Sequence, residues 1–143
     1  MREFNSATEY YVAAPVEGEL EPDFKELAAG ILEVDPDIDD ETEEFGYYDI
    51  EGGGTELAIG RIAHSYTVSG HRFVEDEGQN IISALEWEQE GRVIPFRIVD
   101  SDYTYEGEAT VSNIKLRGGE SNDYRPFECE IRWVGKPDRT PTV

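Results

Sequence analysis

The carboxylates are the side chains of this sequence that occur most often at spacings suited to chemistry. Asp35, Asp37 and Asp39 alternate, as the first ligands of a calcium-binding loop do. A loop of the EF-hand type starting at Asp35 would also require glycine at its sixth position and glutamate at its twelfth, and these positions hold Asp40 and Gly46. The calcium pattern therefore fails, and we interpret the run as a solvated interaction loop without a bound metal.

Two pairs of alternating glutamates, Glu106 with Glu108 and Glu128 with Glu130, have the residue types needed for glycoside hydrolysis. With 33 acids in 143 residues, however, such pairs arise by chance. A hydrolase would also need one buried acid with a raised pKa beside an ionised partner in a cleft. We predict no catalytic residues and keep a carboxylate-pair hydrolase as an alternative.

Other reactive groups are sparse. His64, His71 and the single Cys129 are too few and too scattered for a structural zinc site. The sequence has no phosphate-binding loop, no G-x-S-x-G and no dinucleotide fingerprint, so no cofactor is expected. Cys129 lies in an apolar alternation, which favours a small buried hydrophobe over a nucleophile.

The elements that would position these side chains follow mainly a period of two. In residues 124–134 the apolar side chains Phe127, Cys129, Ile131 and Trp133 alternate with polar ones, which predicts a strand with one buried face. Similar patterns predict strands at 8–14, 27–34, 55–69, 93–99 and 103–116, separated by turn clusters at 52–54, 100–102 and 118–123.

Helical spacing appears once, between residues 75 and 90. Asp76 is the expected N-cap, Gln79 its reciprocal partner and Gly91 the stop. We therefore predict a single domain, residues 1–143, of mainly β class: a β-sandwich or open barrel with one flanking α-helix.

Two segments lack this periodicity. Residues 33–44 contain eight acids in twelve positions, and we expect an acidic, exposed loop over about 33–54. Residues 136–143 contain Pro137 and Pro141, and we expect a C-terminal arm that reaches away from the body.

The formal charge of −21 and a pI near 4.2 argue against a nucleic-acid-binding surface and against anionic membranes. No apolar run is long enough to span a bilayer, and residues 1–6 do not resemble a secretory signal, so we expect the chain to stay in the cell that makes it. Nine of the twelve cations are Arg, a bias that suits a hypersaline host. An electronegative functional surface explains the acidity equally well, and both interpretations stay open.

Several short segments resemble the major tail (tail tube) proteins of long-tailed siphophages. They are Tyr66–Phe73, Glu75–Asp76 and Gly78–Leu85 at a strand-to-helix join, Glu106–Ile114 in a strand, the Gly118–Gly119 hairpin, Gly135–Pro137 and Thr140–Pro141. Their shared order covers the chain from about Ala28 to the C-terminus. Gly78 departs from the family, in which alanine is frequent at this position.

The resemblance implies a phage-tail-tube-like fold in a structural, non-enzymatic virion protein. Its copies would form hexameric rings that stack into a tube for genome ejection, assembled in the host cytoplasm, with the tape measure, tail terminator and distal tail or baseplate proteins as partners. The expected lumen-lining residues are Glu106, Glu108, Glu128 and Glu130. The expected inter-ring contacts are Asp35, Asp37, Asp39, Glu41, Lys136, Pro137 and Arg139.

An acidic wall suits a bore through which DNA slides, because an ionised carboxylate has no hydrogen to donate to a phosphate. We therefore expect Arg61, Arg97 and Arg132, which lie among these strands, to pair with acids. The second alternative is a ligand- or carbohydrate-binding β-sandwich, in which some of the eight Tyr and two Trp would form an exposed stacking platform.

Overall fold

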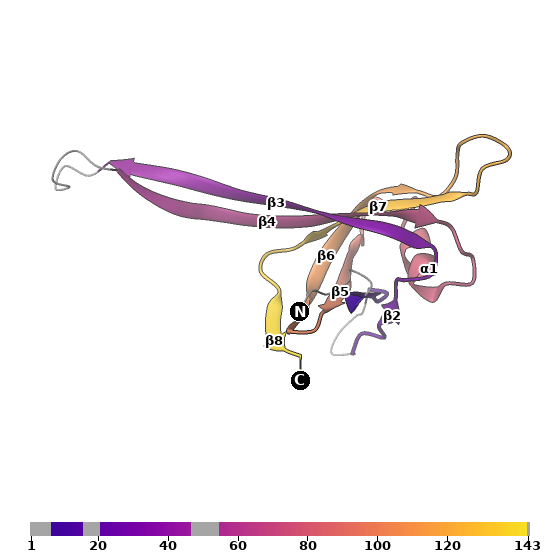
Figure 1. The fold of residues 1–143 in the computed structure, drawn as a ribbon, viewed down its shortest axis with the longest axis horizontal. Helices are drawn as coiled ribbons and strands as arrows, with labels where there is room; N and C mark the ends of the chain where they lie inside the picture. The colour runs from indigo at the N-terminus through magenta and orange to yellow at the C-terminus, as the bar shows by residue number, and fades with distance from the viewer. Residues whose placement is uncertain (1–6, 16–20, 47–54, 143) are drawn as a thin grey trace.

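The computed structural model describes residues 7–15, 21–46 and 55–142, with only the backbone described at 40–46 and 55–62. Its strands form a single antiparallel sheet in the order β2-β1-β5-β6-β7-β4-β3, with β8 paired to β6. The sheet bends into an open half-barrel, and α1 lies near one end of it (Figure 1). The prediction of a mainly β fold with one helix is confirmed. The elements are β1 (Glu9–Val12), β2 (Lys25–Glu26), β3 (Ile31–Gly46), β4 (Thr55–His71), α1 (Glu77–Ser83), β5 (Val93–Val99), β6 (Tyr103–Lys115), β7 (Pro126–Trp133) and β8 (Asp138–Pro141).

The acidic segment is a strand, and the prediction of a loop over about 33–54 is wrong for residues 33–46. β3 pairs with β4 from Ile31 opposite Gly70 to Gly46 opposite Thr55. The acids repel one another in isolation, but β4 supplies a partner rich in β-branched and small residues, and alternate acids in a strand point to opposite faces. The expected turn at 52–54 lies outside the described residues.

The C-terminal segment does not reach away from the body, which corrects the second expectation. β8 pairs with β6 from Glu106 opposite Asp138 to Tyr103 opposite Pro141. β7 pairs with the farther part of the same strand, so β8 continues beyond β7. The prolines do not prevent pairing, because Pro137 precedes the strand and Pro141 is its last residue.

The helix is shorter than predicted. The carboxylate of Asp76 caps it, since Oδ2 accepts a hydrogen bond of 3.0 Å from the amide of Gln79. Regular helix ends at Ser83, and turns occupy residues 84–87. None of the helical segments among the described residues has the length and hydrophobicity to cross a membrane.

Gly78, which departs from the resembling family, stands where the helix meets β2. A Cβ atom on Gly78 would lie 2.5 Å from the carbonyl oxygen of Glu26 and 3.1 Å from the Cα atom of Leu27. Both are backbone atoms that a side-chain rotation cannot move. Close contact between α1 and the β2 segment therefore requires glycine in this chain.

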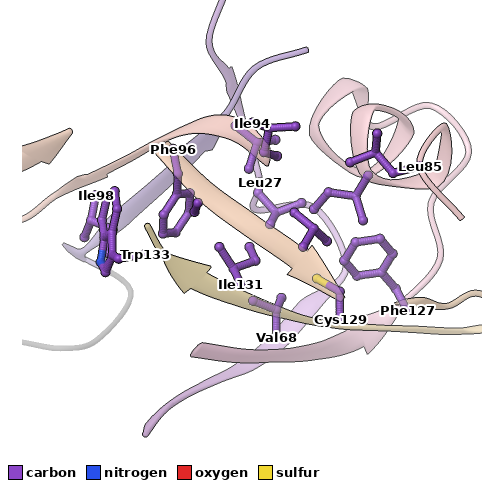
Figure 2. Close-up of a cluster of buried hydrophobic side chains, with 14 of the residues drawn as sticks. Leu27, Val68, Leu85, Ile94, Phe96, Ile98, Phe127, Cys129, Ile131 and Trp133 are labelled. Atoms are coloured by element: carbon purple, nitrogen blue, oxygen red, sulfur yellow. The ribbon is translucent and has the colours of Figure 1, made fainter. Parts of the chain in front are cut away.

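The core fills the concave side of the sheet beneath α1 (Figure 2). Phe96 lies near its centre, in a tilted contact with Trp133 at 4.9 Å between ring centroids. The fully buried side chains also include Val12, Val68, Ile82, Ile94, Val111, Leu116, Phe127, Cys129 and Ile131. Cys129 is thus the buried hydrophobe that its alternation predicts, and burial raises its pKa to about 12.

Candidate functional site: the acidic face and the arm

The sheet has a second face, opposite the core, and the strand register brings the four candidate lumen glutamates to it. Residues paired across antiparallel strands point to the same side. Glu130 lies between Thr67 of β4 and Ser112 of β6, while Glu128 lies between Ser69 and Lys115. Glu106 and Glu108 on β6 lie opposite Arg97 and Pro95 of β5. We call this side of the sheet the acidic face.

The acidic face extends into β3, which the sequence did not suggest. Asp35 lies opposite Thr67 and Asp37 lies opposite Ser65, so these acids share the side of Glu130. The intervening Val34 lies opposite the buried Val68 and belongs to the core side. Asp35, Asp37 and Asp39, predicted as loop contacts, therefore continue the same surface as the predicted lumen residues. Had residues 33–39 been predicted as a strand, their alternation would have placed Asp35, Asp37 and Asp39 on the same side of it.

Cations on the acidic face are few. Arg97 forms an ion pair of 2.9 Å with Glu106 across the β5–β6 pair, which confirms the expected pairing for that residue. Arg132 is exposed and has no ion pair among the described residues, so the same expectation is wrong for Arg132. The side chain of Arg61 lies outside the described residues. Glu130 accepts a hydrogen bond of 3.2 Å from Asn113, a residue in the left-handed conformation at a bulge of β6.

No group of three or more His, Cys, Asp or Glu side chains is arranged to hold a metal ion in the part of the chain that the structure describes. The backbone that carries Asp35, Asp37 and Asp39 is extended. Successive side chains on one face of a strand are about 7 Å apart, whereas a calcium loop curls around the ion. The alternating acids of β3 thus form a row.

The described acids do not have the arrangement of a hydrolase. Asp102 has a raised pKa because it shares a hydrogen bond with Asp100, and both lie in the exposed turn between β5 and β6. Burial raises the pKa of Asp100, but hydrogen bonds from the Asp102 side chain and from the Tyr103 and Asp102 amides outweigh it, so the net shift is downward. Asp100 and Asp102 share a proton in a solvated turn, whereas hydrolysis requires an acid that is buried in a cleft.

A stacking platform for a ligand is also missing from the described surface. Trp87 is 85% exposed and Tyr124 is 81% exposed, but Trp87 follows α1 and Tyr124 precedes β7. The other described Tyr side chains are partly buried, and Trp133 is in the core. Phe73, 46% exposed, lies at the same end as Tyr124, but Trp87 lies apart from both, so the exposed rings do not form the broad platform of several rings that was expected.

The β3–β4 hairpin projects far beyond the rest of the sheet (Figure 1). β4 pairs with β7 only from Ser65 to His71, so residues 55–64 of β4 and 38–46 of β3 have no third strand beside them. We call these two segments the arm. Nine residues of extended chain span about 30 Å. Glu41 lies on the arm opposite Arg61 in the strand register.

The other candidate contact residues lie where β8 joins the sheet. The guanidinium of Arg139 stacks 3.5 Å above the ring of Tyr103. Pro137 lies beside Gly107, where a Cβ atom on the glycine would be 3.4 Å from the proline Cα. Lys136 is exposed in the connection between β7 and β8. Within the chain, Pro137 and Arg139 thus contact β6, and their inter-ring role stays a prediction.

Gln79 does not make the reciprocal cap predicted for it, because its side chain is completely buried and bonds elsewhere. Its amide nitrogen donates to the carbonyl oxygens of Ala29, at 2.8 Å, and His71, at 2.9 Å. Its oxygen accepts from the backbone amide of Phe73 and from Arg72. Gln79 therefore joins the helix to the end of β4 and to the segment before β3.

No family model and no curated protein sequence matches the chain. Three solved structures share its fold over almost its whole length. They are the tail of an empty gene transfer agent (GTA) particle, refined with C6 symmetry (TM-score 0.71), the virion of a native gene transfer agent (TM-score 0.70) and the SPP1 tail tube (TM-score 0.66). Each is 16% identical to this chain and covers 98–99% of it, matching 100% of the two gene transfer agent chains and 80% of the SPP1 chain. The chain has the fold of tail tube proteins.

Proposed function

We propose that this protein is a tail tube subunit, a structural component of a virion or virion-like particle. The observation that carries the proposal is that the half-barrel, the helix and the projecting hairpin together match the whole length of a gene transfer agent tail subunit. At 16% identity the shared feature is the fold. An enzymatic role has no comparable support, because the similar structures are components of tails and virions.

In this proposal six copies close into a ring, and rings stack into a tube. The C6 symmetry of the similar gene transfer agent tail supports the number six. The subunit offers unpaired strand edges for lateral contacts, since β2 and β3 are the two ends of its sheet. Exposed edges of this kind readily pair with strands of another chain.

The acidic face lines the bore. Glu106, Glu108, Glu128 and Glu130 present acceptors, and the phosphates of DNA are acceptors too, so the wall offers DNA little to bind. The ion pair between Arg97 and Glu106 neutralises one of the few cations on this face. DNA then passes through the tube during ejection without being retained by the wall.

The arm makes the contact between successive rings. An isolated two-stranded hairpin is at best marginally stable in water, and no third strand among the described residues lies beside the arm. A neighbouring copy would supply the missing contacts. The tape measure, tail terminator and distal tail or baseplate proteins complete the assembly in this proposal, which takes place in the host cytoplasm.

Electron microscopy of the purified protein tests the proposal. We expect rings or tubes with a central channel, and the samples should be prepared both in dilute buffer and at several molar salt because self-repulsion at a charge of −21 is screened only in the latter. A protein that stays monomeric in both conditions at high concentration would contradict the proposed function.

A further inference from the structure

We propose that the arm of one copy docks on a cationic, partly apolar surface at the opposite end of the next copy. This surface, the receiving end, is formed where β4 ends and β7 begins. It consists of Arg72, Lys115, Arg117, Arg125, Leu32, Phe73, Val74 and Tyr124. The inference rests on the proposed function, because it identifies what the arm contacts when rings stack.

The two surfaces lie at opposite ends of the molecule. The arm extends to one side of the body, and the connection between β6 and β7 extends to the other, next to α1 (Figure 1). A hydrogen bond of 2.9 Å from the amide of Arg72 to the carbonyl oxygen of Arg125 ties the end of β4 to the start of β7. If copies in successive rings are stacked along the tube axis, the arm of one copy would thus lie against the receiving end of the next.

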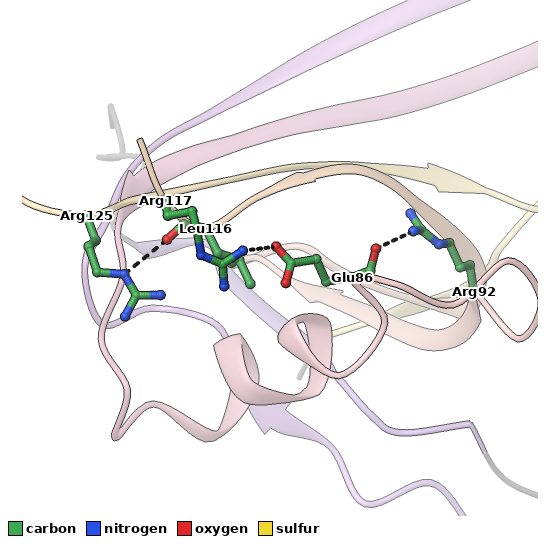
Figure 3. A network of polar contacts seen from close by, with 5 residues as sticks. All are labelled: Glu86, Arg92, Leu116, Arg117 and Arg125. Atoms are coloured by element: carbon green, nitrogen blue, oxygen red, sulfur yellow. Dashed lines mark hydrogen bonds and ion pairs between the residues drawn. The ribbon is translucent and has the colours of Figure 1, made fainter. Parts of the chain in front are cut away.

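Arg72 and Arg125 lie next to each other at this end, and neither forms an ion pair with a carboxylate among the described residues. Arg72 donates to the Phe73 carbonyl and to the amide oxygens of Gln79 and Asn80. Arg125 is exposed, and its Nε donates to the carbonyl oxygen of Leu116 (Figure 3). Burial and then the nearby charge of Arg125 lower the pKa of Arg72, so the two cations repel each other in the isolated subunit.

Two further cations border this pair and differ in how far they are neutralised. Arg117 forms an ion pair of 2.9 Å with Glu86 (Figure 3). Lys115 lies opposite Glu128 in the strand register. The connection between β6 and β7 also carries Glu120 and Asp123, and Asp123 accepts a hydrogen bond from the amide of Glu120. Among the cations of the receiving end, Arg117 is thus neutralised by an ion pair, whereas Arg72, Arg125 and Lys115 form none among the described residues.

Exposed apolar side chains gather at the same end. Leu32 is 73% exposed, and Phe73, Val74 and Tyr124 are exposed as well. The ring of Tyr124 lies 5.2 Å from the ring of His71, and Phe73 packs beside Gly30, at the start of β3. Four of the eight large hydrophobic residues that are exposed in the described part of the chain thus lie beside the unneutralised arginines.

The arm complements this surface in both respects. Asp37 at its base and Asp39 on it are exposed on one side, and the strand continues with Asp40, Glu41, Glu43 and Glu44. Ile38, 61% exposed, points to the other side. A second copy thus supplies both the carboxylates that Arg72 and Arg125 lack and an apolar contact for Tyr124. Asp76 interacts electrostatically with Arg72, but no carboxylate of the body forms an ion pair with Arg72 or Arg125 in the described structure.

A charge swap tests the contact. In Arg125→Glu the new acid would face the acidic arm, and we expect the critical concentration for tube formation to rise roughly tenfold or more. Reversal of the arm in Asp37→Lys/Asp39→Lys should have a similar effect. Combining all three substitutions in one chain should restore at least part of the assembly. The measurements belong at the lowest salt concentration at which the wild type forms tubes.

Arg132→Glu is the matched control, since it makes the same charge change at an exposed arginine on the acidic face, away from the receiving end. Circular dichroism should show that every variant is folded. Normal tubes from folded Arg125→Glu, or no rescue by the combined variant, would overturn the docking contact while leaving the tail tube function intact. A wild type that forms no tubes at all would instead overturn the proposed function.

Discussion

The body of the sheet and the arm are built from the same antiparallel pairing but are stabilised differently. In the body, β5, β6 and β7 each turn an apolar face to the core, where their buried side chains pack around Phe96 and Ile131. Along the arm, β3 and β4 pair with each other, with one register shift at Glu41 and Thr42, and no third described strand lies beside them. The body therefore obtains its stability from its own core, whereas in the proposed tube a neighbouring copy supplies contacts to the arm.

This difference separates folding from assembly. A substitution in the core should unfold the subunit whether or not a tube forms. A substitution on the arm should leave the subunit folded and alter assembly alone. Substitutions in the core and on the arm test this difference, and they follow in order of decreasing effect on the free energy of unfolding.

Phe96→Ala should have the largest effect. The ring is completely buried and contacts Trp133, so its removal leaves a cavity that costs about 3–5 kcal/mol of unfolding free energy. Ile38→Ala on the arm is the comparison, and it should change this free energy by less than about 0.5 kcal/mol because Ile38 is exposed. Urea unfolding followed by circular dichroism measures both. Equal losses in the two variants would refute the contrast.

Gln79→Ala should be next. Its removal leaves the carbonyl oxygens of Ala29 and His71 and the amide of Phe73 without their buried partner, which costs about 2–3 kcal/mol. Gln89→Ala changes an exposed glutamine and serves as the control. If both variants unfold at the same urea concentration, Gln79 does not join helix and sheet in the way described.

The buried thiol of Cys129 predicts a loss of stability in alkali. Its pKa is about 12 in the folded protein against about 8.5 in an unfolded chain, so above pH 8.5 the unfolded state loses a proton that the folded state retains. Stability should fall by about 2 kcal/mol up to pH 10 from this group. Cys129→Ala should lack this contribution, and identical pH slopes for the two proteins would contradict the burial of the thiol.

Neutralising the acids of β3 should have the smallest effect on folding. Asp35→Asn, Asp37→Asn and Asp39→Asn together should change the unfolding free energy by less than about 1 kcal/mol, with a slight gain at low salt from reduced repulsion. Sedimentation should meanwhile show weaker tube formation. A cooperative loss of the subunit fold would show that the hairpin contributes to the core.

The sequence predicts the body and the β4 half of the arm better than the β3 half, for a physical reason. Because β5, β6 and β7 each bury one face, apolar residues recur at every second position in their sequences. The limits of these strands were predicted within two residues. In β3, residues 35–39 are all exposed, so neither side of this stretch is apolar and no alternation reveals the strand. β3 is a strand because it pairs with β4, and the local composition of residues 31–46 does not show that pairing.

The candidate site was predicted in part. Alternation placed Glu106, Glu108, Glu128 and Glu130 on the polar sides of their strands, and the register brings all four to one face. The continuation of this face into Asp35 and Asp37 depends on the β3–β4 pairing, which composition does not reveal. The pairing of β8 with β6 was missed because the effect of a proline depends on its place in the strand.

The central claim is that the acidic face of each subunit lines the bore of a tube. The most direct test is a cryo-electron microscopy structure of the assembled protein in which side chains are visible. The account predicts that Glu106, Glu108, Glu128 and Glu130 face the channel and that Arg97 stays paired with Glu106. A tube in which this face points outward, or whose bore carries two or more unpaired arginines per subunit, would contradict it.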